Sequence, residues 1–458
     1  MCKQAKIVST INSNDLHFDT VIVGLGLTGL ACARYLATRN ERIAITDSRE
    51  IPPQLGALQQ ELPDIPLFLG NINRNLLCKA DRLIVSPGVS IHESPVRDAI
   101  ASGIPATGDI ELFCQHVTAP IVAITGSNGK STVTTLLAIM AERAGFKIRS
   151  GGNLGPPALD LIRASEPDLY VLELSSFQLE LVHSLNAKAA VILNVSADHQ
   201  DRYPSMQEYF VAKQRIYQGD GTMVINRDDE LVSRLTDPER KVMKFTLDKP
   251  DGDEFGIRKI GNNDWLMHGS ERLMAESELR IRGKHNTANA LAALALGSAL
   301  DIPMAPMLAT LREFPGLPHR CQWVTQYKSV DWYNDSKGTN IGACIASIAG
   351  LGGDGNVVLI AGGMGKGADF SALSEIAQDK LRAAVLMGVD APKIECVLSN
   401  IVPVHMVQDM AKAVRIAADI AEPGDVVLLS PACASFDMFE DYKARGTVFT
   451  TEVMRLTG

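Results

Sequence analysis

The sequence predicts an α/β fold divided into three domains. At 458 residues the chain is too long for a single hydrophobic core. Short apolar segments typical of buried strands alternate with segments of helical character, which is the pattern of mainly parallel sheets covered by helices. Two segments with the composition of interdomain linkers, residues 116–120 and 313–320, interrupt this alternation. We therefore expect an irregular extension followed by three domains, with bounds 1–18, 19–116, 117–316 and 317–458.

The composition is that of an ordinary globular protein, with 46% hydrophobic and 21% charged residues. The net charge of −9 argues against general binding to nucleic acids or anionic membranes. The eight cysteines form no Cys-x-x-Cys pair and no zinc-type cluster with histidine, so we expect reduced thiols. Residues 1–19 contain no apolar segment typical of a signal peptide. Together these features predict a cytoplasmic protein without a membrane anchor.

The first domain opens with a glycine-rich turn of the kind that binds a nucleotide. An apolar strand runs into Gly24, Gly26 and Gly29, and Asp47 follows a second strand about 20 residues later. A third strand leads into the turn Ser86–Gly88, whose backbone could face the same crevice. The pattern alone leaves three interpretations open: NAD or FAD, the diphosphate of another nucleotide, or a purely structural turn.

The clearest functional signal is the loop Gly126–Thr132, which directly follows the apolar strand Ile121–Ile124. Backbone N–H groups and the start of the next helix would bind phosphate oxygens there, and Lys130 adds a positive charge. Ser131 or Thr132 provides a hydroxyl for Mg²⁺. The loop is a variant, because an isoleucine replaces the first glycine of the usual pattern. The alternative is an ordinary strand–turn–helix corner with an exposed lysine.

Two further side chains of the middle domain follow predicted strands, where parallel sheets bind their ligands. Glu173 ends the strand Asp168–Leu172 and is placed to reach an Mg²⁺ that also contacts Ser131, with helix capping as the alternative. His199 lies just past the strand Ala189–Leu193 and is either a metal ligand or a structural histidine. Both positions predict a metal-dependent phosphate chemistry.

Three other features of the middle domain are less specific. Lys213 lies among apolar neighbours in a helix predicted from Met206 to Gln218, and an exposed lysine is its simplest interpretation. Residues Ser150–Pro156 are predicted to form a loop. Asn286 and Asn289 share one face near the start of a helix, which suits either nucleotide recognition or helix capping.

The last domain contains three polar clusters, each after a predicted strand: Tyr333–Asn340, Leu359–Asp369 and Pro423–Asp437. Since the carboxyl ends of parallel strands meet at one edge of a sheet, these clusters should face one pocket. Lys337, Lys366, Ser435 and backbone N–H groups would bind carboxylates in it. We expect Arg445 to close the helix that follows the third cluster.

These motifs together resemble the Mur ligases, the ATP-dependent amide-forming enzymes of peptidoglycan precursor synthesis. The match covers essentially everything after residue 19 and is carried by six segments: Gly126–Thr132, Glu173–Gln178, Asp198–Arg202, His285–Asn289, Pro318–Arg320 and Asn334–Asn340. Three more features resemble the D-glutamate-adding branch of the family: Gly24–Gly29 with Asp47, the loop Gly362–Phe370, and Leu429–Asp437. Met364 stands where the family often has an acidic residue.

The resemblance implies a Rossmann-like N-terminal domain that binds a UDP-sugar rather than NAD, a P-loop-type central ATPase domain, and a Rossmann-like C-terminal domain for the amino acid. It implies that D-glutamate is joined to UDP-N-acetylmuramoyl-L-alanine through an acyl phosphate, giving ADP and phosphate. It also implies two Mg²⁺ (or Mn²⁺) ions and a carbamate on Lys213. We expect a monomer with no nucleic-acid or membrane partner, and a hinge closure when ATP binds between the second and third domains.

The resemblance further implies a role for individual residues. The catalytic residues would be Lys130, Glu173, His199 and Lys213, and the metal ligands would be Ser131, Glu173, His199 and carbamylated Lys213. ATP would be bound by Gly126, Ser127, Asn128, Gly129, Lys130, Ser131, Thr132, Asn286, Asn289, Arg320, Asp335 and Lys337. The UDP-sugar would be bound by Gly26, Leu27, Thr28, Asp47, Ser48, Ser86, Gly88, Asn153, Ser175 and Gln178. D-Glutamate would be bound by Thr339, Lys366, Ser435, Phe436 and Tyr442.

Other functions compete with this one. The nearest are a sister ligase that adds another amino acid and a folylpolyglutamate synthase. A nicotinamide dehydrogenase would use Gly24–Gly29 and Asp47 but would leave Lys130, Glu173 and the last domain without a role. A nucleotide-regulated binding protein would need the phosphate loop alone. Phosphate release that requires both donor and acceptor separates the ligases from the other two classes.

Overall fold

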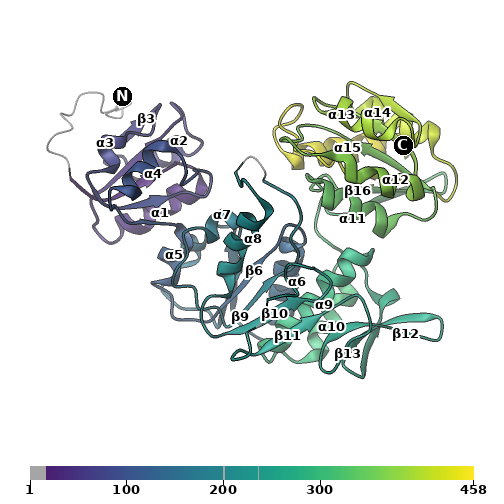
Figure 1. The fold of residues 1–458 in the computed structure, drawn as a ribbon, viewed down its shortest axis with the longest axis horizontal. Coiled ribbons are helices and arrows are strands. Elements are labelled where there is room, and N and C mark those ends of the chain that lie inside the picture. Colours follow the sequence, from purple (N-terminus) through teal and green to yellow (C-terminus); the bar gives the residue numbers. More distant parts are fainter. Residues whose placement is uncertain (1–16, 200–201, 236, 458) are drawn as a thin grey trace.

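The computed structural model describes residues 17–199, 202–235 and 237–457, and it contains three separate sheets in chain order. We call the parts built on them the first, middle and last units (Figure 1). The sheets have five, nine and six strands, and each is mainly parallel with helices in the connections. The predicted three-domain α/β class is therefore confirmed. Within the described residues, no helix combines the length and apolar character needed to cross a membrane.

The first unit has the strand order β3-β2-β1-β4-β5, with every pair parallel, as in Rossmann-like domains. Its strands are β1 Phe18–Val23, β2 Ile43–Asp47, β3 Leu67–Leu69, β4 Ala80–Val85 and β5 Ala106–Thr107. Its helices are α1 Leu27–Ala37, α2 Leu55–Glu61, α3 Arg74–Leu77, α4 Ser94–Ala101 and α5 Asp109–Cys114. Phe18 already belongs to β1, so the extension predicted over residues 1–18 is too long, and residues 1–16 lie outside the described part of the chain.

The middle unit has the strand order β14-β13-β12-β11-β10-β9-β6-β8-β7, in which only β12–β14 pair antiparallel. Its strands are β6 Ile121–Thr125, β7 Ile148–Gly152, β8 Leu169–Glu173, β9 Ala189–Ile192, β10 Thr222–Asn226, β11 Val242–Phe245, β12 Phe255–Ile260, β13 Asn263–His268 and β14 Glu271–Ala275. Its helices are α6 Lys130–Arg143, α7 Ser176–Leu179, α8 Met206–Gln214, α9 Lys284–Ala299 and α10 Met304–Glu313.

Two predictions for the middle unit are wrong in their bounds. Ser150, Gly151 and Gly152 pair with β8 as part of β7, although they were expected in a loop. The glycines obscure the strand because this edge leaves no room for side chains: a Cβ on Gly151 would lie 2.4 Å from the Pro156 carbonyl oxygen. The helix predicted to reach Gln218 ends at Gln214 and continues as a 3₁₀ turn, Arg215–Tyr217.

The last unit has the strand order β15-β16-β20-β17-β18-β19, with only β15 antiparallel to its neighbour. Its strands are β15 Gln322–Tyr327, β16 Val330–Asn334, β17 Val357–Ala361, β18 Leu381–Leu386, β19 Val404–Met406 and β20 Val426–Leu429. Its helices are α11 Ile341–Leu351, α12 Leu373–Lys380, α13 Ala391–Leu398, α14 Met410–Ile420 and α15 Tyr442–Thr457. Four short 3₁₀ turns complete the described elements: Ala158–Leu161, Arg215–Tyr217, Glu276–Glu278 and Phe370–Ala372.

Arg445 does not close a helix, as the sequence predicted, but lies in the first turn of α15. Its side chain is only 1% exposed and donates hydrogen bonds to Ser336 Oγ, the Ser336 carbonyl and the Cys433 carbonyl. These bonds join the turn after β16 to the loop after β20. Two of the three polar clusters predicted to face one pocket are therefore held together by a buried guanidinium group.

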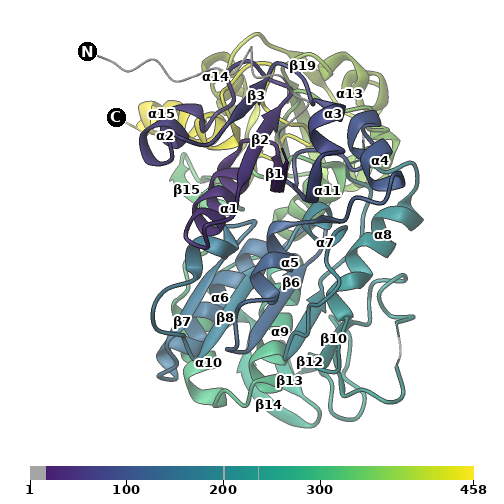
Figure 2. The same ribbon diagram turned by 90° about the vertical axis from the view of Figure 1, so that its left-hand side faces the viewer.

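The first and last units both contact loops of the middle unit and lie above it in Figure 2. Arg202, which follows β9, donates to the carbonyl of Pro87 in the first unit at 3.0 Å. Arg320, just before β15, donates to Ser131 of the middle unit at 2.6 Å. The loops at the carboxyl ends of the middle strands therefore form the junction of all three units, where ligands of parallel sheets are expected.

Candidate active site

The predicted phosphate loop joins β6 to α6, and two neighbouring elements fix its shape. The backbone N–H of Asn128 donates to Asn194 Oδ1 at 2.8 Å, and that of Ser127 donates to the Asn194 carbonyl at 2.9 Å. Gly129 has φ +84°, and a Cβ there would lie 2.3 Å from Asn289 Oδ1. Only glycine fits this position without a shift of α9. Asn289, which was predicted to bind ATP, thus borders the loop.

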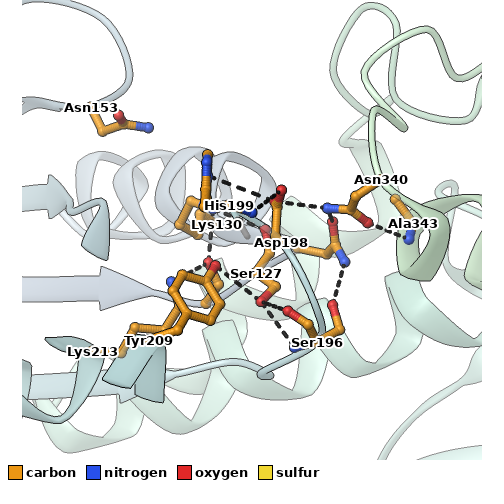
Figure 3. A network of polar contacts seen from close by, with 12 residues as sticks. Ser127, Lys130, Asn153, Ser196, Asp198, His199, Tyr209, Lys213, Asn340 and Ala343 are labelled. Carbon is orange, nitrogen blue, oxygen red and sulfur yellow. Dashed lines mark hydrogen bonds and ion pairs between the residues drawn. The ribbon is translucent and has the colours of Figure 1, made fainter. Parts of the chain in front are cut away.

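Lys130 folds back over its own loop (Figure 3). Its Nζ donates to the carbonyl oxygens of Gly126 at 2.8 Å and Ser127 at 3.0 Å. Burial lowers the pKa of Lys130, while the negative charges of Glu173 and Asp198 act in the opposite direction. A phosphate group would contact the backbone N–H groups of this loop, and the two bonds hold the ammonium within the same loop.

Ser131 and Glu173 place two oxygen donors side by side, of the kind that bind hard cations. Ser131 Oγ donates to Glu173 Oε2 at 2.6 Å, and Asn153 Nδ2 donates to Glu173 Oε1 at 2.6 Å. Arg320 Nη2 in turn donates to Ser131 Oγ at 2.6 Å. Glu173 is 2% exposed, so its carboxylate is desolvated and aimed at the loop. A hydroxyl beside a carboxylate at the end of a phosphate loop suits Mg²⁺.

The donor set also indicates how a metal ion would be held. Among the described residues, no three His, Cys, Asp or Glu side chains gather closely enough to bind a metal by themselves. Mg²⁺ commonly takes only one or two protein ligands and completes its shell with water and phosphate oxygens. Ser131 and Glu173 therefore fit an ion that arrives with a nucleotide rather than one that is permanently bound.

Lys213 is not the exposed lysine of the simplest interpretation. Its side chain is 1% exposed, its Nζ donates to the Gly126 carbonyl at 3.0 Å, and it lies 4.4 Å from the centre of the Tyr209 ring. Burial, followed by the charge of Lys130, places the pKa of Lys213 well below its ordinary value. Sequence reasoning missed Tyr209, whose hydroxyl is 3.2 Å from Ser127 Oγ, because a tyrosine in a helix carries no functional signal.

His199 lies on the loop that follows β9, with a positive φ of 54°. Its ring packs edge to face on Phe177 at 4.6 Å, and its Nε2 is 3.8 Å from Asp198 Oδ2. Burial lowers the pKa of His199, Asp198 raises it, and the charges of Lys366, Lys130 and Lys213 lower it again. The structure therefore brings Lys130, Glu173 and His199 into one site. Gln200 and Asp201 of the same motif lie outside the described residues.

The last unit contributes a third lysine, Lys337, to this site. The Lys337 Nζ lies 4.2 Å from the centre of the Tyr442 ring. Burial and the charges of Arg320 and Lys130 lower the pKa of Lys337 to about 8. Asp335 was predicted to line the ATP, but its carboxylate points into the last unit and accepts from Ser347 Oγ and Ser430 Oγ at 2.7 and 2.8 Å. Burial raises the pKa of Asp335 to about 6.

A cavity of about 230 Å³ lies beside the phosphate loop, between the middle and last units. Three residues predicted to bind ATP line it: Thr132, Asn286 and Arg320. Tyr333, the first residue of a polar cluster predicted to face a pocket, also lines it. Sequence reasoning missed the remainder of the wall, which includes Arg280, Arg282, Leu317, Cys321 and Trp323. Trp323 comes from a strand with an ordinary strand pattern, so the sequence offered no signal that it faces a ligand cavity.

In the first unit, two predicted ligand residues stabilise the glycine-rich turn itself. Asp47, 3% exposed, accepts from the backbone N–H of Leu25 at 2.7 Å and from Arg49 Nη2 at 2.7 Å. Ser86 Oγ donates to the Gly24 carbonyl at 2.8 Å. Five other residues predicted to bind the UDP-sugar are accessible to solvent around this turn. They are Leu27, which is 63% exposed, and Gly26, Thr28, Ser48 and Gly88.

Ser175 and Gln178 serve the structure of α7. Ser175 caps this helix in a reciprocal pair with Gln178, and the Gln178 amide donates to Asp109 of the first unit at 3.0 Å. Arg202 makes a second connection to the first unit: it donates to Glu180 at 2.6 Å and to the Pro87 carbonyl, and its guanidinium stacks on Phe177. The turn around Ser86 is thus linked to the loop that carries His199.

The residues predicted to bind D-glutamate lie in the loops that follow β16, β17 and β20 and at the start of α15. Lys366 is exposed, has φ +52°, and lies close enough to lower the pKa of His199. Ser435 is 2% exposed, whereas Phe436 is 63% exposed. Thr339 and Tyr442 are half-buried. Met364 pairs with Ala434 through two backbone hydrogen bonds of 2.9 Å, which joins the two loops.

Three family models match consecutive parts of the chain. They are described as the Mur ligase MurD-like N-terminal domain (residues 18–108), the Mur ligase middle domain (124–297) and the Mur ligase glutamate ligase domain (319–433). Together they span most of the chain and follow the order of the three sheets.

Curated relatives named UDP-N-acetylmuramoylalanine–D-glutamate ligase are similar over nearly the whole chain. The one from Nitrosococcus oceani is 53% identical over 95% of this chain and 96% of its own length. Those from Methylococcus capsulatus and Pseudomonas putida are 48% and 49% identical, over 96% of this chain and 96% and 98% of their own lengths.

Solved structures show the same fold at low identity. The UDP-N-acetylmuramate–alanine ligase MurC from Thermotoga maritima matches with a TM-score of 0.57 and 19% identity, over 96% of this chain and all of that one. MurF from Acinetobacter baumannii matches with a TM-score of 0.57 and 16% identity, over 97% and 93% of the two chains. These likenesses support the three-unit architecture alone.

Proposed function

Because this chain belongs to the Mur ligase family, we propose that it joins D-glutamate to UDP-N-acetylmuramoyl-L-alanine with ATP, the reaction for which its curated relatives are named. It is an ATP-dependent acid–amino-acid ligase of peptidoglycan precursor synthesis. One structural observation carries the mechanism: Arg320 of the last unit donates to the same Ser131 hydroxyl that donates to Glu173. A triphosphate in the loop would therefore meet groups from both units.

The chemistry requires activation of a carboxylate, which is a poor acyl donor because its leaving group would be oxide. In the proposed first step a carboxylate oxygen of the muramoyl substrate attacks the γ-phosphorus, and the bond to ADP breaks. The amine of D-glutamate then attacks the acyl carbon. The bond between that carbon and the phosphate oxygen breaks, phosphate leaves with its electron pair, and the amine loses a proton. Both steps depend mainly on positioning and on neutralising charge.

The residues of this chain supply those two effects. Lys130, Lys337 and Arg320 place three cations around the position of the phosphates. Asn286, Asn289 and Thr132 would border the nucleotide, the first and third of them in the cavity beside the loop. Magnesium, when bound, would neutralise phosphate charge, and Ser131, Glu173 and His199 are the side chains that would hold it.

We also propose a carbamate on Lys213. A buried, neutral amine is the form that attacks the carbon of CO₂, and the pKa of Lys213 is well below its ordinary value. The N–C bond forms, one proton is released, and an anionic carboxylate replaces a potential cation. This group would lie next to Gly126 and Tyr209, where it could support a second metal ion near His199.

The remaining assignments follow from the same likeness. The substrates would be UDP-N-acetylmuramoyl-L-alanine around Gly26, Leu27, Thr28 and Asn153, and D-glutamate around Thr339, Lys366, Ser435, Phe436 and Tyr442. With the first boundary corrected to Phe18, we propose domains at residues 18–116, 117–316 and 317–458, a monomer, no nucleic-acid or membrane partner, and a cytoplasmic location.

Phosphate release with varied amino acids tests the proposal. With ATP, Mg²⁺ and UDP-N-acetylmuramoyl-L-alanine present, D-glutamate should produce phosphate and ADP in equal amounts, and L-glutamate, L-alanine and diaminopimelate should not. Release with diaminopimelate or L-alanine would instead indicate a sister ligase. Phosphate release without any amino acid would favour a nucleotide-regulated binding protein, and binding of NAD would reopen the dehydrogenase hypothesis.

A further inference from the structure

Asn340 contacts both catalytic loops of the middle unit, although it belongs to the last unit (Figure 3). It caps α11, where its Oδ1 accepts from the backbone N–H of Ala343 at 2.8 Å. Its Nδ2 donates to Asp198 Oδ2 at 3.0 Å and to Asn128 Oδ1 at 3.3 Å. Because the cap uses the oxygen, the amide nitrogen must point across to the middle unit.

The backbone next to Asn340 supports the same close approach. A Cβ on Gly342 would lie 3.0 Å from Ser196 Oγ and 3.3 Å from Ser196 Cβ. The first turn of α11 therefore packs directly on the loop between β9 and His199. A glycine at this point lets the helix start come close enough for the short Asn340 side chain to reach across.

Both acceptors of Asn340 are connected to groups that the reaction would use. Asp198 Oδ1 accepts from the backbone N–H of His199 at 2.9 Å. Asn128 is part of the phosphate loop, and its amide nitrogen lies 3.5 Å from Ser196 Oγ. A change at Asn340 would thus reach the backbone of His199 through one carboxylate and the phosphate loop through one amide.

We propose that Asn340 is a positioning residue that makes the shape of the phosphate loop and of the His199 loop depend on docking of the last unit. It acts through Asp198 and Asn128 rather than on a substrate. Since the last unit would carry D-glutamate, this arrangement delays phosphoryl transfer until the amino-acid unit is in place. The catalytic consequence rests on the proposed function, whereas the effect on the two loops does not.

The sharpest variant is Asn340→Ser, because serine caps helices about as well as asparagine but has no amide donor. We expect a thermal midpoint close to that of the unmodified protein, a kcat at least tenfold lower, and an unchanged Kd for ATP measured by titration. Asn340→Asp keeps the cap and faces Asp198 with a second carboxylate, so its loss of kcat should be larger. Asn73→Ser, the same change at the cap of α3 in the first unit, should leave kcat unchanged.

Two further measurements make the result decisive. Amide hydrogen exchange of residues 194–199 in the ligand-free protein should be faster in Asn340→Ser, whatever the reaction turns out to be. In an Asn128→Ala background, Asn340→Ser should cost a smaller factor in kcat than it does alone, because part of its path is already broken.

The proposal is overturned if Asn340→Ser changes neither the amide exchange of residues 194–199 nor kcat. It is also overturned if this exchange is unchanged and the losses of kcat from Asn340→Ser and Asn128→Ala simply multiply in the double variant. If serine destabilises α11, Asn340→Asp answers the same questions with a cap of equal strength. Faster exchange in a protein that makes no phosphate with D-glutamate would leave the positioning role intact and reject the proposed function alone.

Discussion

The site concentrates positive charge that it does not neutralise by itself. Lys213 is buried, Lys130 and Lys337 are half-buried, and the charges of neighbouring cations lower the pKa of Lys213 and Lys337 further. Glu173 and Asp198 are the acids that act on them. Like charges held together out of water are unfavourable unless a polyanion joins them. A triphosphate is such a polyanion, which makes the unfavourable arrangement understandable as preparation for binding.

The Lys213 carbamate leads to a rescue experiment. We expect Lys213→Ala to lose about 10²-fold or more in kcat, since a misplaced group near the reacting atoms has effects of that size. Because the alanine leaves room beside Gly126 and Tyr209, a short carboxylic acid such as formate or acetate should restore part of the rate. Lys130→Ala, which lacks the ammonium of the phosphate loop, should not regain rate when the acid is added. Equal responses of the two variants would argue against a carbamate.

Lys337 should impose a pH limit on ATP use. Its pKa of about 8 lies below its ordinary value, so the ammonium is charged below pH 8 and loses its proton above it. If this charge binds phosphate oxygens, kcat/KM for ATP should fall as pH rises through about 8, because that ratio reports the free enzyme. The groups that act on Lys337 are Arg320, Lys130, Glu173 and Asp198.

Lys337→Arg is the control for this limit, because guanidinium stays charged throughout the range. The arginine variant should lose the fall near pH 8 even if its maximal rate is lower. If kcat/KM for ATP falls with the same midpoint in both proteins, the fall belongs to another titrating group, and Lys130 would be the next residue to replace.

At the residue scale, sequence reasoning located the groups that carry chemistry but not their surroundings. Lys130, Glu173 and His199 were found because each follows a strand, and parallel strands bring such positions together. Burial of Lys213 was missed because α8 mixes polar and apolar residues and shows no single apolar face. Asn340, Arg202 and Tyr209 make their contacts between segments distant in sequence, and no local pattern reports such contacts.

At the element scale, the first unit depends on a close approach between α1 and the turn after β1. A Cβ on Gly29 would lie 2.0 Å from the Gly24 carbonyl oxygen. Gly29→Ala should therefore push α1 away from β1 and destabilise the unit by about 1–3 kcal/mol or more, as overpacking does. Urea unfolding monitored by circular dichroism measures the change.

Gly56→Ala is the matched control for this substitution. Gly56 lies in α2 of the same unit, and nothing would come within 4 Å of an added Cβ. There the alanine should be neutral or stabilising by up to about 1 kcal/mol, because it is a better helix former. Equal destabilisation at both positions would show that the close approach at Gly29 is not what constrains the turn.

The elements themselves were predictable where burial and sequence pattern agree. The central strands β1, β2, β6, β8 and β9 are continuous apolar runs, and their positions were expected to within a few residues. The edge strand β7 was missed because its glycines remove the side chains on which strand patterns depend. Arg445 was misplaced because an isolated arginine gives no sign of which end of a helix it occupies.

At the scale of the whole molecule, the two seams between units differ in chemistry. One hydrophobic core includes Ile22, Leu25 and Leu36 of the first unit together with Leu172 and Leu174 of the middle unit. The two clusters of the last unit contain buried residues of that unit alone. The contacts described across the second seam, by Arg320 and Asn340, are polar. The second seam has no shared hydrophobic core among the described residues, although α11 packs on α9, so we expect the last unit to move more easily than the first.

This difference predicts which ligand changes the shape of the molecule. The polar second seam should open part of the time in solution in the absence of ATP, because exposed and half-buried polar contacts compete with water and are screened by salt. Adding Mg²⁺–ATP should close it, since phosphates would bridge Lys130 of the middle unit and Lys337 of the last unit. The radius of gyration from small-angle X-ray scattering should then decrease.

UDP-N-acetylmuramoyl-L-alanine alone is the control, because it would bind mainly at the first seam, whose apolar core already fixes the two units. It should leave the radius of gyration nearly unchanged, and higher salt should enlarge the radius of the ligand-free chain but not that of the chain with ATP. Identical scattering profiles in all five conditions would mean that the second seam stays shut by itself. Closure on ATP binding would then be rejected, and the contacts of Asn340 with Asp198 and Asn128 would form whether or not the nucleotide is bound.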